Sequence, residues 1–124
     1  MALTKLQSGI TLADLHEAGS LAALGADIFE GGDVKFYVKP THGTPTDPIN
    51  AGYFGTTKGR YRLVYPFDEQ ATITWGEVKI TDESTGETHF YKAGDSWFIT
   101  AGTSTLWEVV SAGYTKHYYA VVPA

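Results

Sequence analysis

Residues 91–109 read YKAGDSWFITAGTSTLWEV, and they decide the fold because two tight turns divide them into short strands. The first turn is formed by Gly94 and Asp95, and the second contains Gly102. Glycine permits a positive φ angle, and an aspartate side chain can accept hydrogen bonds from turn amides. The stretches between the turns hold aromatic and β-branched residues, which are typical of strands. We therefore predict short strands joined by tight turns.

The same pattern extends over most of the chain. Apolar runs at 34–38, 60–65, 70–75, 77–81, 88–91, 106–110 and 114–122 are separated by turn residues, and residues 42–52 (HGTPTDPINAG) are predicted to form a loop. This spacing predicts an all-β sandwich or barrel in residues 31–124. Residues 1–30 differ, and we expect an N-terminal arm with a short helix that Thr11 and Asp14 open and Gly19 ends.

Composition excludes several classes of protein. The chain of 124 residues is one domain in size, with a formal charge of −5 and no basic run, so no nucleic-acid partner is expected. It contains no cysteine, which excludes disulfides and thiolate metal sites. The N-terminus lacks the pattern of a signal peptide, and its longest apolar run, Leu21–Leu24, is too short to cross a membrane. We therefore expect a cytoplasmic protein.

Strand alternation identifies the first candidate site residue. Successive side chains in a strand point to opposite faces, so Glu69 shares the apolar face with Ala71, Ile73 and Trp75. The same alternation turns Val78 and Ile80 inward, and Tyr61 and Trp107 with them. A carboxylate on the core side of a strand is costly unless it is paired, ligated or protonated. Glu69 is therefore the residue to which we first assign a function.

The motifs resemble those of the cupins, small β-barrels of the jelly-roll type. Their first motif has a glutamate seven residues before a turn glycine, as Glu69 and Gly76 are here. The upstream pattern His-x-His-Pro-x-x-Glu corresponds to LVYPFDE, residues 63–69. The second motif corresponds to GDSWFITAGTST, residues 94–105. The resemblance implies a double-stranded β-helix, or jelly-roll barrel.

A nearer resemblance is to a subfamily of small cupins, the DUF861 group, related to ureidoglycine aminohydrolase and the ethanolamine-utilisation cupins. Its members tend to read YPxxE, then a glycine-aspartate turn followed by a tryptophan, then a basic strand that ends in tyrosine. The counterparts here are residues 65–69, residues 94–109 with Trp107, and TKHYY from Thr115. The match covers roughly residues 50–122.

The resemblance also shows where a metal site would lie. Cupin metal sites use three imidazoles and one carboxylate, a donor set suited to Mn, Fe or Zn. In this chain Leu63, Tyr65 and Thr105 stand at the three histidine positions, and Glu69 alone is retained. We therefore expect no metal cofactor, although a metal held by Tyr65, Glu69 and a histidine from elsewhere is an alternative.

The remaining candidate site residues are polar and aromatic residues that the strand alternation turns towards the barrel interior. Glu69 could act as a general acid or base assisted by Tyr65, or it could be a buried structural residue satisfied by Tyr65 or a backbone amide. Thr105 could hydrogen-bond a ligand and Trp107 could stack on it, or both could pack in the core. Candidate ligand-binding residues also lie on the last strand, at Lys116 and Tyr118.

Two interpretations of that last strand remain open. If it faces inward, Lys116 could pair with Glu69 or hold an anionic substrate. If it is an edge strand or a dimer contact, Lys116 reaches solvent. Trp97, just after the Gly94–Asp95 turn, could flank a pocket or lie between subunits.

These observations predict a cupin that binds a small polar or anionic metabolite in the barrel without a metal, and a homodimer. The first alternative is a metal-independent isomerase or hydrolase that uses Glu69, and the second is a metal-dependent cupin enzyme. The enzyme hypothesis requires Glu69 to be accessible from a pocket.

Overall fold

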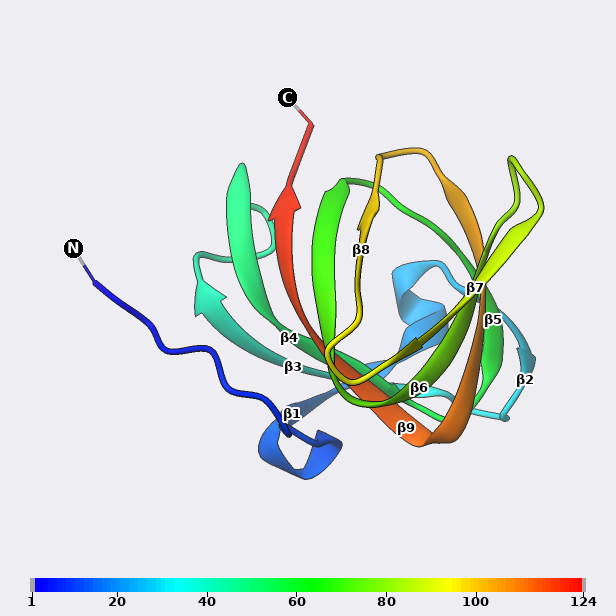
Figure 1. Cartoon of the computed structure of the whole chain (residues 1–124), viewed down its shortest axis with the longest axis horizontal. Helices are drawn as coiled ribbons and strands as arrows, with labels where there is room; N and C mark the ends of the chain where they lie inside the picture. The colour runs from blue at the N-terminus through cyan, green and yellow to red at the C-terminus, as the bar shows by residue number, and fades with distance from the viewer. Residues whose placement is uncertain (1, 124) are drawn as a thin grey trace.

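Strands dominate the computed structural model, which describes residues 2–123 (Figure 1). Two short 3-10 turns, η1 (Leu12–Asp14) and η2 (Leu21–Leu24), lie near the N-terminus. The strands in chain order are β1 (His16–Ser20), β2 (Asp27–Glu30), β3 (Lys35–His42), β4 (Ile49–Thr57), β5 (Arg60–Val64), β6 (Asp68–Asp82), β7 (Glu87–Lys92), β8 (Ser96–Ile99) and β9 (Ser104–Val121). The predicted all-β fold is confirmed.

The strands form one antiparallel sheet that curls into a barrel of the jelly-roll type. Its order is β1-β3-β4-β9-β5-β2, and β6 joins it by pairing with β9 and also with β7 and β8. The first part of β9, residues 104–108, pairs with β5, and the part from residue 113 onward pairs with β4. Because β6 follows β9 along nearly its whole length, these two long strands connect the two ends of the curled sheet.

The last strand is not an edge. Strand β9 has β4 and β5 on one side and β6 on the other, and Lys116 is only 4% exposed. The interpretation of this strand as an edge with Lys116 in solvent is therefore wrong. The alternative, that Lys116 faces inward, is confirmed.

Strand β6 continues through Gly76, where the sequence predicted a break. It bends by two irregularities, one between Ile73 and Trp75 and one between Gly76 and Val78. Gly76 has a φ of +87°, and a methyl group there would lie 2.8 Å from the Cα of Tyr114. Only glycine allows the strand to turn this closely against β9.

The first bulge corrects the predicted orientation of Trp75. Ile73 pairs with Lys116, but Trp75 pairs with Thr115, and paired residues of neighbouring strands project from the same face of a sheet. Trp75 therefore lies on the outer face with Thr115, because Thr74 is the extra residue that shifts the alternation. Beyond this bulge the even-numbered residues of β6 face inward, so Val78 is buried as predicted.

The N-terminal segment differs from the expected helix. Asp14 closes a turn by accepting a hydrogen bond from the Thr11 amide at 2.9 Å, but only η1 is helical there. Residues 16–20 form β1, paired with β3, and residues 27–30 form β2, paired with β5. Before η1, the chain contacts the sheet: Gly9 donates from its amide to the Thr74 carbonyl at 3.0 Å.

No helix within residues 2–123 is long and apolar enough to cross a membrane.

Strand β4 was missed entirely, because residues 49–52 were assigned to the predicted loop at 42–52 and no strand was predicted at residues 53–57. The turn before β8 agrees with its prediction. Gly94 has a φ of +94°, and the Asp95 carboxylate accepts a hydrogen bond from the Lys92 amide at 2.9 Å. These turns place β8 against the first part of β6, where Glu69 lies.

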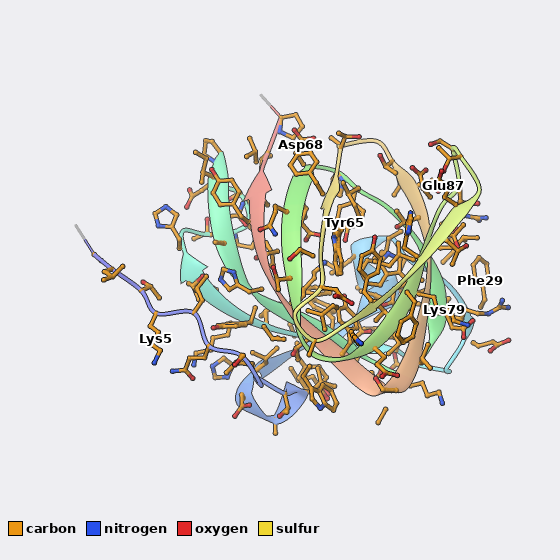
Figure 2. All side chains as sticks on the ribbon, viewed as in Figure 1. Lys5, Phe29, Tyr65, Asp68, Lys79 and Glu87 are labelled. Carbon is orange, nitrogen blue, oxygen red and sulfur yellow. The ribbon has the colours of Figure 1, made fainter. Side chains whose placement is uncertain are left out.

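The core fills the concave side of the sheet. Tyr65 projects into this interior, whereas Lys5 and Phe29 lie at the periphery (Figure 2). Large rings dominate the centre: Trp107 stacks on Tyr61 and Tyr114, with ring centroids 6.1 and 5.4 Å away. The polar residues described next are embedded in this aromatic core.

Candidate functional site

A buried ion pair lies at the centre of the barrel. Strand β9 carries Lys116 and β6 carries Glu69, and the Lys116 Nζ is 3.0 Å from Oε1 and 3.1 Å from Oε2 of the carboxylate. The two side chains are 5% and 2% exposed. A charge this deeply buried requires a partner of opposite sign, so each residue explains the burial of the other.

Two further donors complete the hydrogen bonding of the pair. Lys116 Nζ donates to the Tyr65 hydroxyl at 3.1 Å, and the Trp97 indole Nε1–H donates to Glu69 Oε2 at 3.2 Å. Burial lowers the pKa of the Lys116 ammonium, and the Glu69 carboxylate opposes this shift. Burial also raises the pKa of the Tyr65 phenol, and the charge of Glu69 adds to the effect. Tyr65 therefore remains a neutral hydroxyl at physiological pH.

Aromatic rings surround the ammonium on several sides. The Lys116 Nζ lies 5.2 Å from the ring centroids of Phe54 and Trp107. It lies 5.5 Å from the ring centroid of Tyr65 and 5.6 Å from that of Trp97. These distances fall within the roughly 6 Å range of cation–π attraction. We call Phe54, Tyr65, Glu69, Trp97 and Trp107 the cation box.

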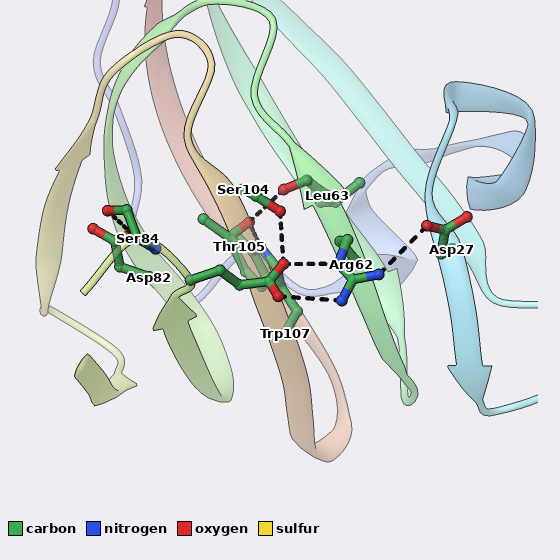
Figure 3. Close-up of polar contacts among 9 residues, drawn as sticks. Asp27, Arg62, Leu63, Asp82, Ser84, Ser104, Thr105 and Trp107 are labelled. Carbon is green, nitrogen blue, oxygen red and sulfur yellow. Dashed lines mark hydrogen bonds and ion pairs between the residues drawn. The ribbon is translucent and has the colours of Figure 1, made fainter. Parts of the chain in front are cut away.

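Thr105 stabilises one wall of this box. Its hydroxyl donates to the Leu63 carbonyl oxygen at 2.9 Å and accepts from the Trp107 indole Nε1–H at 2.9 Å (Figure 3). Thr105 is 1% exposed, so both hydrogen bonds are shielded from water. The residue at the expected histidine position therefore orients Trp107.

A charged cluster holds the same end of the sheet together from outside. Glu83 accepts from Arg62 Nε at 2.7 Å and Nη2 at 3.1 Å, and its Oε1 also accepts from the Ser104 hydroxyl at 2.6 Å. The Arg62 guanidinium holds the pKa of the Glu83 carboxyl below its usual value. Figure 3 shows Arg62 between β2 and the start of β9, reaching towards Asp27. The cluster joins the strands that carry Leu63 and Thr105.

A cavity of about 320 Å³ lies on the concave side, between β7, β8 and the start of β9. Its volume is at the lower end of the range for small-molecule sites. Trp97 and Thr105 belong both to this cavity and to the surroundings of the ion pair. The other lining residues are Ile80, Asp82, Glu87, His89, Tyr91, Phe98, Ile99, Thr100 and Thr103.

The structure brings together most of the predicted site residues. Glu69, Tyr65 and Lys116 are in direct contact, and Trp107 packs against the ammonium. Thr105 reaches the group through Trp107 and also lines the cavity. Tyr118 is half-buried on the same face of β9, where it pairs with Ala71 and Gly52.

Sequence reasoning missed other residues of the site. Phe54 was missed because its strand contains glycines that obscure the alternation. For Trp97 the sequence left two interpretations open, the wall of a pocket or a contact between subunits. In the structure its indole N–H donates to Glu69. His89 and Tyr91 line the cavity, but nothing in their local sequence distinguishes them from ordinary strand residues.

The comparisons with known proteins agree with the fold and the motifs. Residues 43–118 match the EutQ-like cupin domain, which is more than half of the chain. The chain therefore belongs to the EutQ-like family of cupins. Among curated proteins, no sequence matches this chain.

Several solved structures share the fold. A DUF861-family protein of unknown function from Pseudomonas syringae is 15% identical with a TM-score of 0.71, over 86% of this chain and 44% of that one. The Clostridium difficile EutQ protein is 16% identical with a TM-score of 0.61, over 85% and 81% of the two chains. A protein assigned to ethanolamine utilisation from Salmonella typhimurium is 20% identical with a TM-score of 0.56, over 86% and 93%. The chain thus spans less than half the length of the Pseudomonas protein.

The residues at the family's metal-binding positions do not fit a metal ion. Leu63 supplies no ligand, and the Thr105 hydroxyl is already engaged by Leu63 and Trp107. Both oxygens of Glu69 contact the Lys116 ammonium, which would repel a second cation. Within residues 2–123, no group of three or more His, Cys, Asp or Glu side chains could hold a metal ion.

Proposed function

We propose that this cupin is a binding module that takes a small polar molecule in the cavity between β7, β8 and β9. The observation that carries the proposal is the cavity itself, whose lining includes Trp97 and Thr105. Aromatic rings provide a flat apolar surface, and the threonines and His89 provide hydrogen-bonding groups around it. A few polar groups on an apolar wall are typical of a ligand site.

The charges around the cavity favour a neutral or cationic molecule over an anion. Asp82 and Glu87, two acidic residues, line the cavity. The prediction of an anionic ligand depended on Lys116, whose charge is balanced by Glu69. We therefore expect a molecule with hydroxyl, amide or amino groups and one apolar face.

The geometry favours binding over acid–base catalysis at Glu69. The enzyme hypothesis needs Glu69 to reach a substrate, but its side chain is 2% exposed and is bonded to Lys116 and Trp97. A substrate in the cavity would meet Trp97 first. Catalysis by Glu69 would require Lys116 and Trp97 to separate from the carboxylate before each turnover.

The test is a thermal-shift screen of small metabolites on the native protein and two variants. A molecule that binds the folded state raises the melting temperature by mass action. His89→Ala removes a largely exposed side chain from the cavity, and His16→Ala removes an exposed histidine of β1 as a matched control. We expect a hit whose stabilisation falls in His89→Ala and persists in His16→Ala. Equal stabilisation of both variants would contradict binding in this cavity.

We also propose that the protein forms a homodimer through the outer face of its sheet. Phe98 on β8 and Tyr119 on β9 both pair with Gln70 of β6, and they are 65% and 45% exposed. Exposed apolar side chains in one row are typical of a contact surface. Light scattering should give twice the chain mass for the native protein and a monomer for Tyr119→Ser, which leaves the cavity lining unchanged. A monomeric native protein at micromolar concentration would contradict this proposal.

A further inference from the structure

The geometry points to Lys116 as a built-in substitute for a metal ion. We propose that its ammonium permanently fills the cation position of the barrel, and that the cation box is a site selective for a primary alkylammonium. This inference concerns the interior behind the cavity and does not depend on the proposed ligand.

The position of the ammonium supports the first part. Tyr65 and Glu69 stand at two of the four positions where the family resemblance places metal ligands, and Lys116 Nζ contacts both. The third position, Thr105, holds Trp107, whose ring faces the ammonium. The groups around that position therefore converge on a nitrogen atom.

The chemistry of the box supports the selectivity. One carboxylate and one phenol hydroxyl can accept the hydrogen bonds of an ammonium, and the rings of Phe54, Trp97 and Trp107 provide cation–π attraction. A divalent first-row metal instead needs several nitrogen or oxygen donors at about 2 Å. Aromatic faces satisfy an ammonium but not the coordination shell of Mn²⁺ or Zn²⁺.

The loss of the family's histidines follows from this substitution. Imidazoles at positions 63, 65 and 105 would serve as ligands of a metal ion, a role that Lys116 makes unnecessary. Because the cation is covalently attached, no metal ligand is needed at these positions, and an apolar side chain (Leu63) and a hydroxyl (Thr105) can occupy them. A lysine also supplies its cation at every metal concentration, because it cannot dissociate from the chain.

Removing the lysine side chain tests the proposal directly. Lys116→Ala keeps Cβ and removes three carbons and the nitrogen, which together correspond to n-propylammonium. The melting temperature of this variant should rise saturably with n-propylammonium chloride, by about 5 °C at tenfold excess over the dissociation constant. KCl at equal ionic strength and 1-propanol, which has the volume without the charge, are the controls.

Three comparisons decide the outcome. The native protein should show no saturable response, because Lys116 occupies the box. Lys116→Ala/Glu69→Gln should lose most of the response, because the carboxylate that attracts the cation is gone. MnCl₂ and ZnCl₂ should stabilise Lys116→Ala less than n-propylammonium does. Stronger stabilisation by either metal, or no response to n-propylammonium in folded Lys116→Ala, would overturn the proposal.

A variant that purifies unfolded still gives a decision. The same additives are then compared by refolding yield, measured from the native tryptophan fluorescence. Recovery by n-propylammonium but not by 1-propanol supports the proposal. Recovery by Mn²⁺ or Zn²⁺, or equal yields in all additives, contradicts it.

Discussion

The Lys116 ammonium and the Glu69 carboxylate face each other across β9 and β6, with Nζ 3.0 Å from Oε1 and 3.1 Å from Oε2. Ile73, four residues after Glu69, is the direct partner of Lys116 in the sheet, so the two charged side chains reach each other along the barrel interior. Their burial makes the pair sensitive to the loss of either member, since a lone buried charge is far more costly than a paired one.

Glu69→Gln should destabilise the protein by about 3–5 kcal/mol, because it leaves the Lys116 ammonium buried without a counter-charge. Urea unfolding measures this change. Asp33→Asn is the matched control, since Asp33 pairs with Lys35 at 2.7 Å on the exposed surface. We expect little effect there. Equal losses in the two variants would show that burial does not set the strength of the pair.

Thr105→Val should destabilise the protein by about 1–3 kcal/mol, because the buried Trp107 indole N–H loses its acceptor. Thr105→Ser retains the hydroxyl and should lose less. Unfolding in urea compares the two variants. If Thr105→Val proved as stable as Thr105→Ser, the hydroxyl would not be what orients Trp107.

Gly76→Ala should destabilise the protein by more than the roughly 1–2 kcal/mol expected for a positive φ alone. The added methyl group would also press against β9, 2.8 Å from the Cα of Tyr114. Gly86→Ala is the control, since Gly86 has a φ of +77° with no atom within 4 Å of the added methyl. Equal unfolding free energies for the two variants would contradict a close approach at Gly76.

Stability should fall as the pH drops below 6.5, partly because of His117. Burial lowers the pKa of its imidazole from the usual 6.5, and the ring is held by Thr41 at 2.8 Å and packs on Tyr53. As the pH falls, the unfolded chain therefore binds the proton before the folded protein does. The contribution of His117 to stability is constant above about pH 6.5 and is lost between pH 6.5 and the lower pKa of the folded state.

Two measurements check this prediction. An NMR titration of the His117 ring protons should give a midpoint below 6.5, and His117→Gln should show a smaller loss of stability between pH 7.5 and pH 5 than the native protein. A midpoint at or above 6.5 would contradict the effect of burial.

Alternation along strands predicted much of the barrel interior. Glu69, Thr105 and Trp107 are buried as expected, because β6 and β9 are regular where these residues lie, and Tyr65, the residue after the end of β5, is also buried as expected. The predicted inward orientation of Trp75 was wrong because one extra residue, Thr74, reverses the alternation, and such bulges are hard to recognise in a sequence.

The other errors have similar local causes. Leucines at positions 12 and 15 resemble a helical face, which concealed the strand that begins at His16. The glycines of β4 weakened the strand signal around Phe54. The orientation of Lys116 depends on the pairing of β9 with β6, and such long-range register cannot be read from one strand alone.

We propose above that Lys116, and not a metal ion, is the cation of this barrel. The most direct measurement is the metal content of untagged native protein after equilibration with Mn²⁺ and Zn²⁺ and extensive dialysis. We predict far less than one metal ion per chain, with the same result for Glu69→Gln. One metal ion retained per native chain and lost in Glu69→Gln would contradict the claim.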